Sequence, residues 1–326
     1  MNNLGDKQIN ILGFKFKLKN FILTITVALV VLLILLLIDM LTSIDVSWYG
    51  VIIGIGFLVA LVMATQLCET RGLNKDFPYD LILWVFPLSL IGARTYYVLC
   101  SLDEFSNFWE MCAIWNGGMA IYGGIIGGLI GLVICCLIKK KDIVSTMDII
   151  APCLILAQSI GRWGNFVNQE VYGFEVTNKA WQWFPACVHI TKNGMDNWFL
   201  ATFFYESVLN LIGAIILIVL LRKVKQKGVV ASSYLIYYGI VRFFLEGLRV
   251  PSYILYIPGT NFPVSQAVSL AIILIGVIWL SCILIKNGRK IKNEKNNNLQ
   301  GSNNNWFFNT CTFLAFVYKK YSGYWF

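Results

Sequence analysis

The chain has 326 residues and a formal net charge of +9; 58% of its residues are hydrophobic and only 13% are charged. A soluble domain carries about a quarter charged residues, so this composition excludes an ordinary soluble enzyme and a disordered protein. The positive charge does not indicate nucleic-acid binding, because membrane proteins concentrate Lys and Arg in their cytoplasmic loops. The sequence predicts an all-α fold, a polytopic bundle of membrane-spanning helices.

Eight apolar stretches have the length of about 20 residues that a helix needs to cross a bilayer. They are 21–39, 48–66, 80–100, 119–138, 147–165, 199–221, 230–248 and 264–285. The first is nearly pure Leu, Ile and Val and lacks an A-x-A cleavage site, so we expect a retained helix rather than a cleaved signal peptide. Glycines in the second, fourth and fifth stretches favour close packing against other helices.

Lys and Arg alternate between the two sides of these spans. One side carries Lys7, Lys15, Lys17 and Lys19, then Arg71 and Lys75, Lys139 to Lys141, Arg222 to Lys227, and Lys286 to Lys295. The other side carries only Lys179, Lys192 and Arg249. Because positive loops stay in the cytoplasm, we expect both termini on the cytoplasmic side of a cell membrane and the sparsely charged loops outside.

The chain divides into three predicted parts. Residues 1–44 form a basic N-terminus and an extra spanning helix, residues 45–290 form a seven-helix core, and residues 291–326 form a cytoplasmic tail. This tail is first rich in Asn and then aromatic from Trp306, and its apolar part is too short to span. We expect it to be disordered or to lie at the membrane interface.

No cofactor or metal is expected. The nine cysteines include no C-x-x-C pair, and His189 is the single histidine, so neither thiolate nor imidazole ligands have the spacing of a metal site. We expect His189 to be an ordinary exposed loop residue.

Ionisable side chains inside the spans are the strongest functional signal. Each costs at least ~2.5 kcal/mol on insertion scales, so each needs a reason. Arg94, Arg162, Glu206 and Arg242 all fall in the predicted outward half of their helices, and the inner half is expected to receive almost no polar groups. Tyr49 and Tyr122 begin two ingoing helices at the same level.

Three arginines against Glu206 leave a surplus of positive charge beneath the predicted outer leaflet. Arginine binds phosphate in a bidentate way and keeps its charge, so a lipid phosphate is the expected ligand. Two alternatives remain. A transporter for an anionic solute or lipid would need polar residues along a through-path, and a membrane scaffold would use arginine–glutamate pairs only to fix the bundle.

Helix spacing adds further residues to this set. Tyr238, Arg242, Glu246 and Arg249 fall on one stripe of a helix, with Glu246 placed to hold either arginine. Arg162 and Asn165 share a face and are followed by Glu170 and Gly173. Gly117 and Gly118 precede a helix, where free N–H groups favour an anion, whereas the Gly-x-x-x-Gly pairs after Tyr122 favour helix packing.

Five ordered segments between about Val46 and Lys286 resemble the bacterial phosphatidylglycerol–prolipoprotein diacylglyceryl transferase family. They are Trp48-Tyr49-Gly50, Asn116 to Gly124, Gly161 to Gly173 (Gly-Arg-Trp-Gly-Asn-Phe-Val-Asn-Gln-Glu-Val-Tyr-Gly), Tyr205-Glu206, and Tyr238 to Arg249. The segment from Gly161 to Gly173 is the most specific of them.

The resemblance implies an enzyme that transfers diacylglycerol from phosphatidylglycerol to the lipobox cysteine of a prolipoprotein signal peptide. A thioether forms and glycerol phosphate leaves on the outer face. It also implies that Arg162 and Arg242 bind the phosphate and stabilise the leaving group. Tyr49, Asn165, Glu170, Gly173, Tyr238, Glu246 and Arg249 would shape the site, and Arg94 matches an arginine of the family's second helix.

The sequence departs from the family at a position where some members have histidine and this chain has Tyr122. A histidine there would suit a base for the thiol, whereas an unperturbed tyrosine has a pKa near 10. Tyr122 is either an activated phenolate or a residue that positions substrate by hydrogen bonding, and we favour the second role. The segment before Tyr205 also lacks the family's frequent His-Pro pair.

Overall fold

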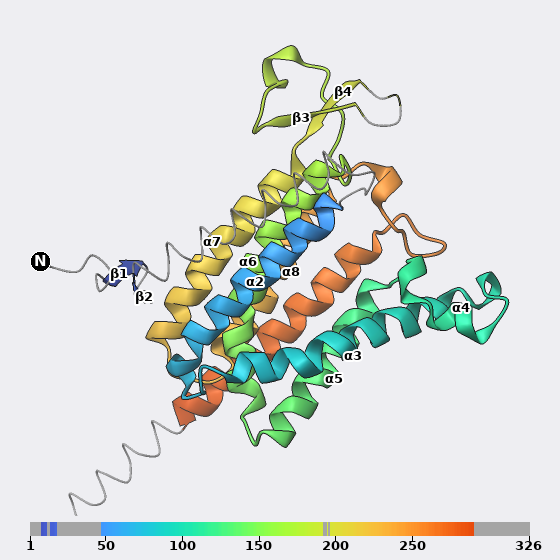
Figure 1. The fold of residues 1–326 in the computed structure, drawn as a ribbon. Coiled ribbons are helices and arrows are strands. Elements are labelled where there is room, and N and C mark those ends of the chain that lie inside the picture. Colours follow the sequence, from blue (N-terminus) through green and yellow to red (C-terminus); the bar gives the residue numbers. More distant parts are fainter. Residues whose placement is uncertain (1–7, 12–13, 18–46, 192–193, 195, 290–326) are drawn as a thin grey trace, which may run out of the picture.

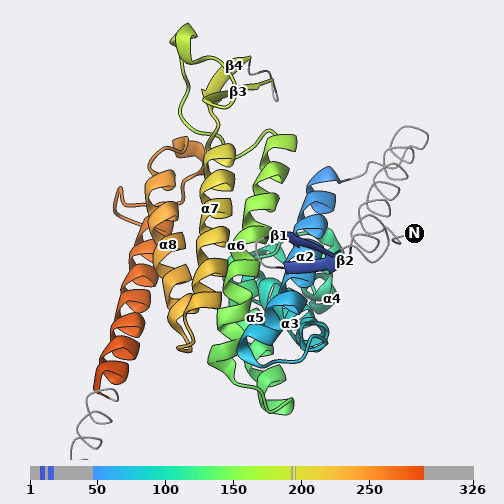
Figure 2. The ribbon, with the colours of Figure 1, turned by 90° about the vertical axis from the view of Figure 1, so that its left-hand side faces the viewer.

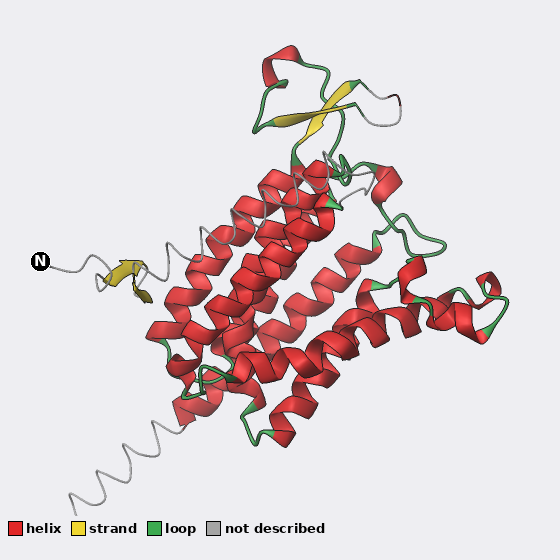
Figure 3. Ribbon diagram, in the orientation of Figure 1, coloured by secondary structure: helices red, strands yellow, loops and turns green. Residues whose placement is uncertain are grey.

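The computed structural model describes residues 8–11, 14–17, 47–191, 194 and 196–289. Seven helices in these ranges are long and apolar enough to cross a membrane, which confirms the predicted polytopic bundle. Helices account for nearly all of its regular structure (Figure 3). The predicted span 21–39 and the tail from residue 291 lie outside the described residues.

The spanning helices follow in chain order, with one short hairpin between the fourth and the fifth. They are α2 (Trp48–Leu67), continued by η2 (Cys68–Arg71), α3 (Phe77–Cys100), α5 (Ile121–Ile138), α6 (Ile143–Val167), α7 (Thr202–Lys223), α8 (Val229–Glu246) and a C-terminal helix (Val264–Arg289). The short elements are β1 (Gln8–Ile11), β2 (Phe14–Lys17), η3 (Leu102–Glu104), α4 (Phe108–Cys112), η4 (Ile114–Asn116), η5 (Lys179–Trp181), β3 (Cys187–Ile190), β4 (Asn197–Leu200) and η7 (Pro251–Tyr253).

Helix α6 is the central element of the bundle and packs against α2, α7 and α8. The C-terminal helix packs on α8, where a Cβ atom at Gly239 would come within 2.7 Å of Ile273. Residues 171–191 and 196–200, with the antiparallel pair β3–β4, project from the end of the bundle at which α6 ends and α7 begins (Figures 1 and 2). We call these residues the arm, and this end of the bundle the arm end.

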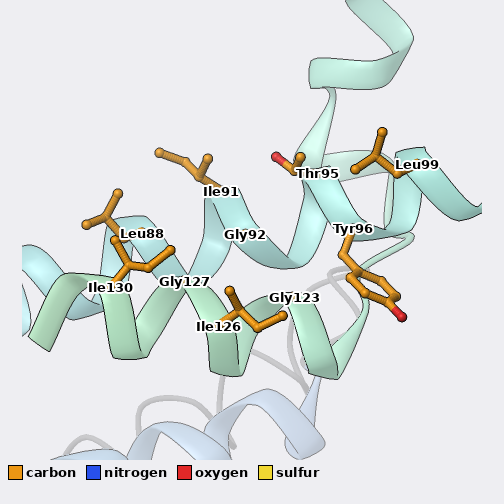
Figure 4. Close-up of a pocket in the computed structure, with 10 residues that line it drawn as sticks. All are labelled: Leu88, Ile91, Gly92, Thr95, Tyr96, Leu99, Gly123, Ile126, Gly127 and Ile130. Atoms are coloured by element: carbon orange, nitrogen blue, oxygen red, sulfur yellow. The ribbon is translucent and has the colours of Figure 1, made fainter. Parts of the chain in front are cut away.

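Helices α3 and α5 form a closely packed pair that runs obliquely to the other helices in Figure 1. Glycines make this contact possible, because a Cβ atom at Gly127 would lie 2.1 Å from the Leu88 carbonyl oxygen and one at Gly123 would lie 2.2 Å from that of Gly92. The two helices line a shallow apolar pocket of about 270 Å³, beside which Tyr96 projects (Figure 4). The predicted packing role of the glycines after Tyr122 is thereby confirmed.

A buried ion pair lies at the opposite end of the bundle from the arm and corrects the expectation that this half holds almost no polar groups. Asp148 of α6 is fully buried, and its Oδ2 atom lies 3.2 Å from Nη2 of Arg71. Asp148 also accepts hydrogen bonds of 2.9 Å from the backbone N–H groups of Gly228 and Ala231 at the start of α8. Because each charge is paired inside the protein, this cluster ties three helices together.

Two strand pairs were not among the predicted elements. β1 and β2 pair antiparallel from Gln8↔Lys17 to Ile11↔Phe14. In the arm, β3 and β4 pair from Cys187↔Leu200 to Ile190↔Asn197, so helix α7 begins at Thr202 rather than at the predicted residue 199. Phe199 is buried against Tyr172, with ring centroids 4.5 Å apart, and this contact packs the first and last parts of the arm together.

Candidate active site

Charged side chains from α6, α7 and α8 meet near the arm end of the bundle. Arg162 of α6 donates a hydrogen bond through Nη2 to Glu206 of α7, and Nη1 of Arg242 on α8 lies 3.7 Å from the other oxygen of the same carboxylate. The side chain of Glu206 is 4% exposed, whereas those of Arg162 and Arg242 are 20% and 18% exposed. One buried carboxylate therefore holds two arginines that remain partly accessible.

The predicted stripe on α8 continues this cluster. Glu246 contacts Arg242 at 3.0 Å and Arg249 at 3.4 Å, which are the i,i+4 and i,i+3 contacts that the helix periodicity predicts. The Nη1 atom of Arg242 and the Nε atom of Arg249 are buried without a hydrogen-bond acceptor among the described residues. These N–H groups are donors that a bound anion could use.

The charges linked by these ion pairs do not balance. Arg162, Arg242 and Arg249 contribute three positive charges against the two carboxylates of Glu206 and Glu246. Burial and the neighbouring Arg242 lower the pKa of Arg249 to about 10. This value is still well above neutral pH, and Arg249 is therefore a cation there. The cluster therefore has a surplus of one positive charge, which matches a singly charged anion.

Asn165 links this cluster to the segment that leads into the arm. It accepts a long hydrogen bond of 3.4 Å from Nη1 of Arg162, and its side-chain amide donates one of 2.9 Å to Glu170. The chain turns sharply at Glu170, since its two neighbours, Gln169 and Val171, both have positive φ angles. The predicted pairing of Arg162 with Asn165 on one face of α6 is confirmed.

Two further predicted residues contact the same cluster. The Tyr49 ring, at the start of α2, packs on the backbone of α6 at Gly164. The Tyr238 hydroxyl, one turn below Arg242 on α8, lies within hydrogen-bonding reach of the Arg162 guanidinium. The structure thus brings residues of four helices together, α2, α6, α7 and α8.

Gly173 positions Arg249 through the backbone. It forms an antiparallel bridge with Arg249, and its N–H donates to the Leu200 carbonyl at 2.9 Å. A Cβ atom at Gly173 would come within 2.7 Å of the Leu248 carbonyl oxygen, so a larger residue would separate these segments. Gly173 therefore joins the arm to the end of α8.

Arg94 lies in a different environment from the other predicted arginines. Its Nε atom donates to the backbone carbonyl of Met111 and its Nη2 atom to the backbone carbonyl of Glu110. Its Nη1 atom donates to the backbone carbonyls of Gly117 and Gly118. The guanidinium carbon also lies 5.2 Å from the centre of the Phe105 ring. Arg94 therefore holds the segment between α3 and α5 through its backbone carbonyls.

The glycines before α5 are part of the Arg94 environment. Gly117 and Gly118 have φ angles of +80° and +69°, a region that favours glycine, and a Cβ atom at Gly118 would lie 2.5 Å from the Tyr97 ring. Tyr122, in the first turn of α5, packs beside Tyr96 with ring centroids 6.4 Å apart. Figure 1 places this end of the α3–α5 pair apart from the arm ends of α6 and α7.

An apolar cleft of about 500 Å³ adjoins the cluster between α2, α6 and α7. Ile52 and Ile55 of α2, Ile160 of α6 and Leu211 of α7 line it, and Trp163 lies beside Arg162 in the sequence. Trp163 donates a hydrogen bond of 3.1 Å to Ser207, and Ser207 donates one of 2.8 Å to the Ser159 carbonyl. These bonds hold α6 and α7 together directly beneath the charged cluster.

Sequence reasoning missed several buried or half-buried polar residues. Asp148 lies inside a predicted span, where a charged side chain is costly to insert into the membrane, so its position indicates a buried ion pair. Asn210, Gln158 and Tyr234 lie within spans too, but neutral side chains give a weaker signal. Within the described part of the chain, no group of three or more His, Cys, Asp or Glu side chains could hold a metal ion.

A family model for prolipoprotein diacylglyceryl transferase matches residues 35–282 of the chain. Phosphatidylglycerol–prolipoprotein diacylglyceryl transferase 1 of Clostridium perfringens is 43% identical over 76% of this chain and 94% of its own length. The phosphatidylglycerol–prolipoprotein diacylglyceryl transferase of Listeria monocytogenes is 38% identical over 72% of this chain and 84% of its own length. That of Finegoldia magna is 40% identical over 72% of this chain and 90% of its own length. The chain belongs to the prolipoprotein diacylglyceryl transferase family.

Proposed function

We propose that this protein transfers the diacylglyceryl group of phosphatidylglycerol to the lipobox cysteine thiol of prolipoproteins. The observation that carries the proposal is the unbalanced cluster of Arg162, Arg242 and Arg249, in a chain similar to enzymes with this name. A phosphodiester carries one negative charge, which is the charge that the cluster lacks. An anionic-solute transporter would need a polar through-path, and the polar residues of the opposite half are paired within the protein.

The reaction joins the cysteine sulfur to the glyceryl carbon that carries the phosphate. The carbon–oxygen bond to the phosphate breaks, glycerol phosphate leaves with the bonding electron pair, and the thiol proton passes to the phosphate product or to solvent. Arg162 and Arg242 would stabilise the charge that develops on the leaving oxygen, because donors preset in a site of low dielectric act most strongly there. Binding both reactants in one site would supply proximity.

The remaining predicted residues would have positioning roles. Glu206 and Glu246 would hold the arginines apart and fixed, while Asn165 and Glu170 would set the orientation of Arg162. Tyr49 and Gly173 would pack the ends of α2 and the arm around the site. Arg94, with Gly117 and Gly118, would shape the segment before α5 rather than bind the phosphate directly.

The site would face the outer leaflet. The loops at the arm end carry few basic residues, whereas those at the opposite end carry Arg71, Lys75, Lys139 to Lys141 and the run from Arg222 to Lys227. Positive loops stay cytoplasmic, so the arm and the charged cluster would lie outside, where prolipoproteins emerge. This orientation agrees with release of glycerol phosphate away from the cytoplasm.

The test uses the full chain in detergent micelles with phosphatidylglycerol labelled in its acyl chains and a lipobox peptide. We expect label on the peptide cysteine, and a loss of at least about 10²-fold in Arg162→Ala and Arg242→Ala. Lys75→Ala is the matched control, since its ion pair with Glu69 is exposed at the opposite end. Near-full transfer in both arginine variants, with unchanged melting temperature, would contradict the proposal.

A further inference from the structure

A second level of polar side chains lies one helical turn below the charged cluster. On α6, Gln158 is four residues below Arg162, and on α8, Tyr234 is four residues below Tyr238. Residues four apart share a helix face and differ in depth by about 6 Å. The side chains of Gln158, Tyr234 and Tyr238 are half-buried between these two helices.

The two tyrosines of this level are held parallel. Their rings stack with centroids 5.8 Å apart and an angle of 14° between the planes. Nε2 of Gln158 donates a hydrogen bond of 3.2 Å to the Tyr234 hydroxyl, and the Arg162 guanidinium lies beside the Tyr238 hydroxyl. The Gln158 amide faces the Tyr234 hydroxyl and the Arg162 guanidinium faces the Tyr238 hydroxyl, while Oε1 of Gln158 is buried without a hydrogen-bond partner among the described residues.

Neither hydroxyl donates to an acceptor among residues 47–191 and 196–289. A half-buried O–H group without an acceptor favours a ligand that supplies one. The ligand needs two acceptor atoms side by side, a few covalent bonds deeper in the membrane than a phosphate. A diacyl glycerophospholipid has this pattern, since each of its two ester carbonyls lies a few bonds from phosphorus on the side of the acyl chains.

We propose that Tyr234 and Tyr238 bind the two ester carbonyls of the diacylglyceryl donor and that Gln158 is the positioning residue that orients Tyr234. This inference rests on the proposed function, because it places the phosphate at Arg162 and Arg242. The site then selects a donor whose chains are joined through esters over one whose chains are joined through ethers. An ether oxygen is a weaker acceptor and lacks the projecting carbonyl.

The experiment compares two phosphatidylglycerols that differ only in this linkage, dioleoyl with ester bonds and dioleyl with ether bonds, with the same lipobox peptide and the full chain. For the unmodified protein we expect kcat/KM to be about fivefold to tenfold higher with the ester donor, as for the loss of a neutral hydrogen bond. Tyr234→Phe should lower kcat/KM for the ester donor and leave that for the ether donor unchanged, so that the ratio falls toward one.

Two further variants separate recognition from folding. Gln158→Met keeps the side-chain length and removes the amide, and it should reduce the ratio without removing the Tyr234 hydroxyl. Tyr237→Phe is the matched control, because that hydroxyl donates to the Leu209 carbonyl at 2.7 Å on another face of α8, and its ratio should stay that of the unmodified protein. Melting temperatures check that each variant is folded.

The outcomes divide clearly. Equal rates with both donors in the unmodified protein, or an unchanged ratio in an active Tyr234→Phe variant, would overturn ester recognition and leave the transfer reaction standing. An unchanged ratio would also be the result if these hydroxyls bound the precursor peptide instead. No transfer from either donor would overturn the proposed function itself.

Discussion

The ring of Tyr49 lies directly on the backbone of α6 at Gly164, where a Cβ atom would come within 2.7 Å of its Cδ2 atom. This contact sets the distance between α2 and α6 beside the charged cluster, because Gly164 lies between Arg162 and Asn165 in the same turn. The glycine is therefore required for close approach and not for backbone conformation.

Replacement of Gly164 by alanine tests the contact with Tyr49, because the helix propensity of alanine acts in the opposite direction. We expect Gly164→Ala to push the Tyr49 ring away and to lower transfer activity by about tenfold or more, as small displacements of positioned groups do. Alanine favours a helix interior by about 1 kcal/mol over glycine, so any loss must come from the contact. Initial rates at saturating phosphatidylglycerol measure the effect.

Gly161→Ala is the matched control, since a Cβ atom there meets nothing within 4 Å. It should keep full activity and raise the melting temperature slightly. Equal activity in the two variants would show that the contact between Tyr49 and Gly164 does not hold the site.

The buried ion pair at the opposite end predicts a variant that affects stability alone. Asp148→Asn removes the charge that faces Arg71 and weakens the cap at the start of α8. Loss of one partner of a buried pair costs about 3–5 kcal/mol, so we expect a clearly lower melting temperature in detergent. The folded fraction should transfer lipid at the normal rate, because the charged cluster lies at the arm end.

Asp80→Asn provides the comparison for this pair. Asp80 pairs with Lys139 at 2.8 Å, but the two side chains are 37% and 40% exposed. Exposed pairs contribute about 0–1 kcal/mol, so the melting temperature should hardly change. A similar loss in both variants would mean that burial is not what makes Asp148 important.

The stripe could be predicted from the sequence because Arg242 and Glu246 belong to α8 and Arg249 follows in the turn directly after it. The spacing of Arg242, Glu246 and Arg249 fixes their relative positions at a known pitch, and the ion pairs follow. The pairing of Arg162 with Glu206 depends on the register between two helices. The sequence places both residues in the outward half of their helices but cannot show that they meet.

The depth of Arg94 in the membrane was also insufficient to predict which groups it contacts. Its position along the helix puts it in the same outward half as the other arginines, whereas its direction around α3 depends on how α3 packs against α5. Its acceptors are backbone carbonyls, which every sequence contains, so no side-chain pattern could reveal them. The strands of the arm escaped prediction because four-residue segments give little periodicity.

Acid should weaken the start of α6 in a predictable direction. A hydrogen bond from the Ser145 hydroxyl, with further support from the Ser145 N–H and from Lys227, holds the pKa of Asp142 below its usual range. A depressed pKa in the folded state means that the unfolded state binds more protons, so stability rises with pH in that window. The contribution is complete above the unfolded pKa of about 3.9 and is lost as the pH falls through the folded value.

Asp142→Asn isolates this charge, because asparagine still caps a helix. We expect the variant to melt at a lower temperature than the unmodified protein near neutral pH, and the difference to shrink as the pH falls below about 4. Melting curves in detergent over this range measure it. A difference that stays constant with pH would show that the carboxylate charge is not responsible.

The position of Tyr122 predicts that its hydroxyl is not the base for the cysteine thiol. Its ring packs beside Tyr96 at the start of α5 and is 38% exposed, whereas the charged cluster comes from α6, α7 and α8. Tyr122→Phe keeps the ring contact, so we expect transfer within roughly threefold of the unmodified protein, since an exposed hydroxyl loses little net hydrogen-bond energy. Loss of a general base would instead cost about 10²-fold or more and would remove a limb of the pH–rate profile. Rates measured across the pH range therefore decide between the two roles, and Tyr238→Phe, beside Arg162, should show the larger loss.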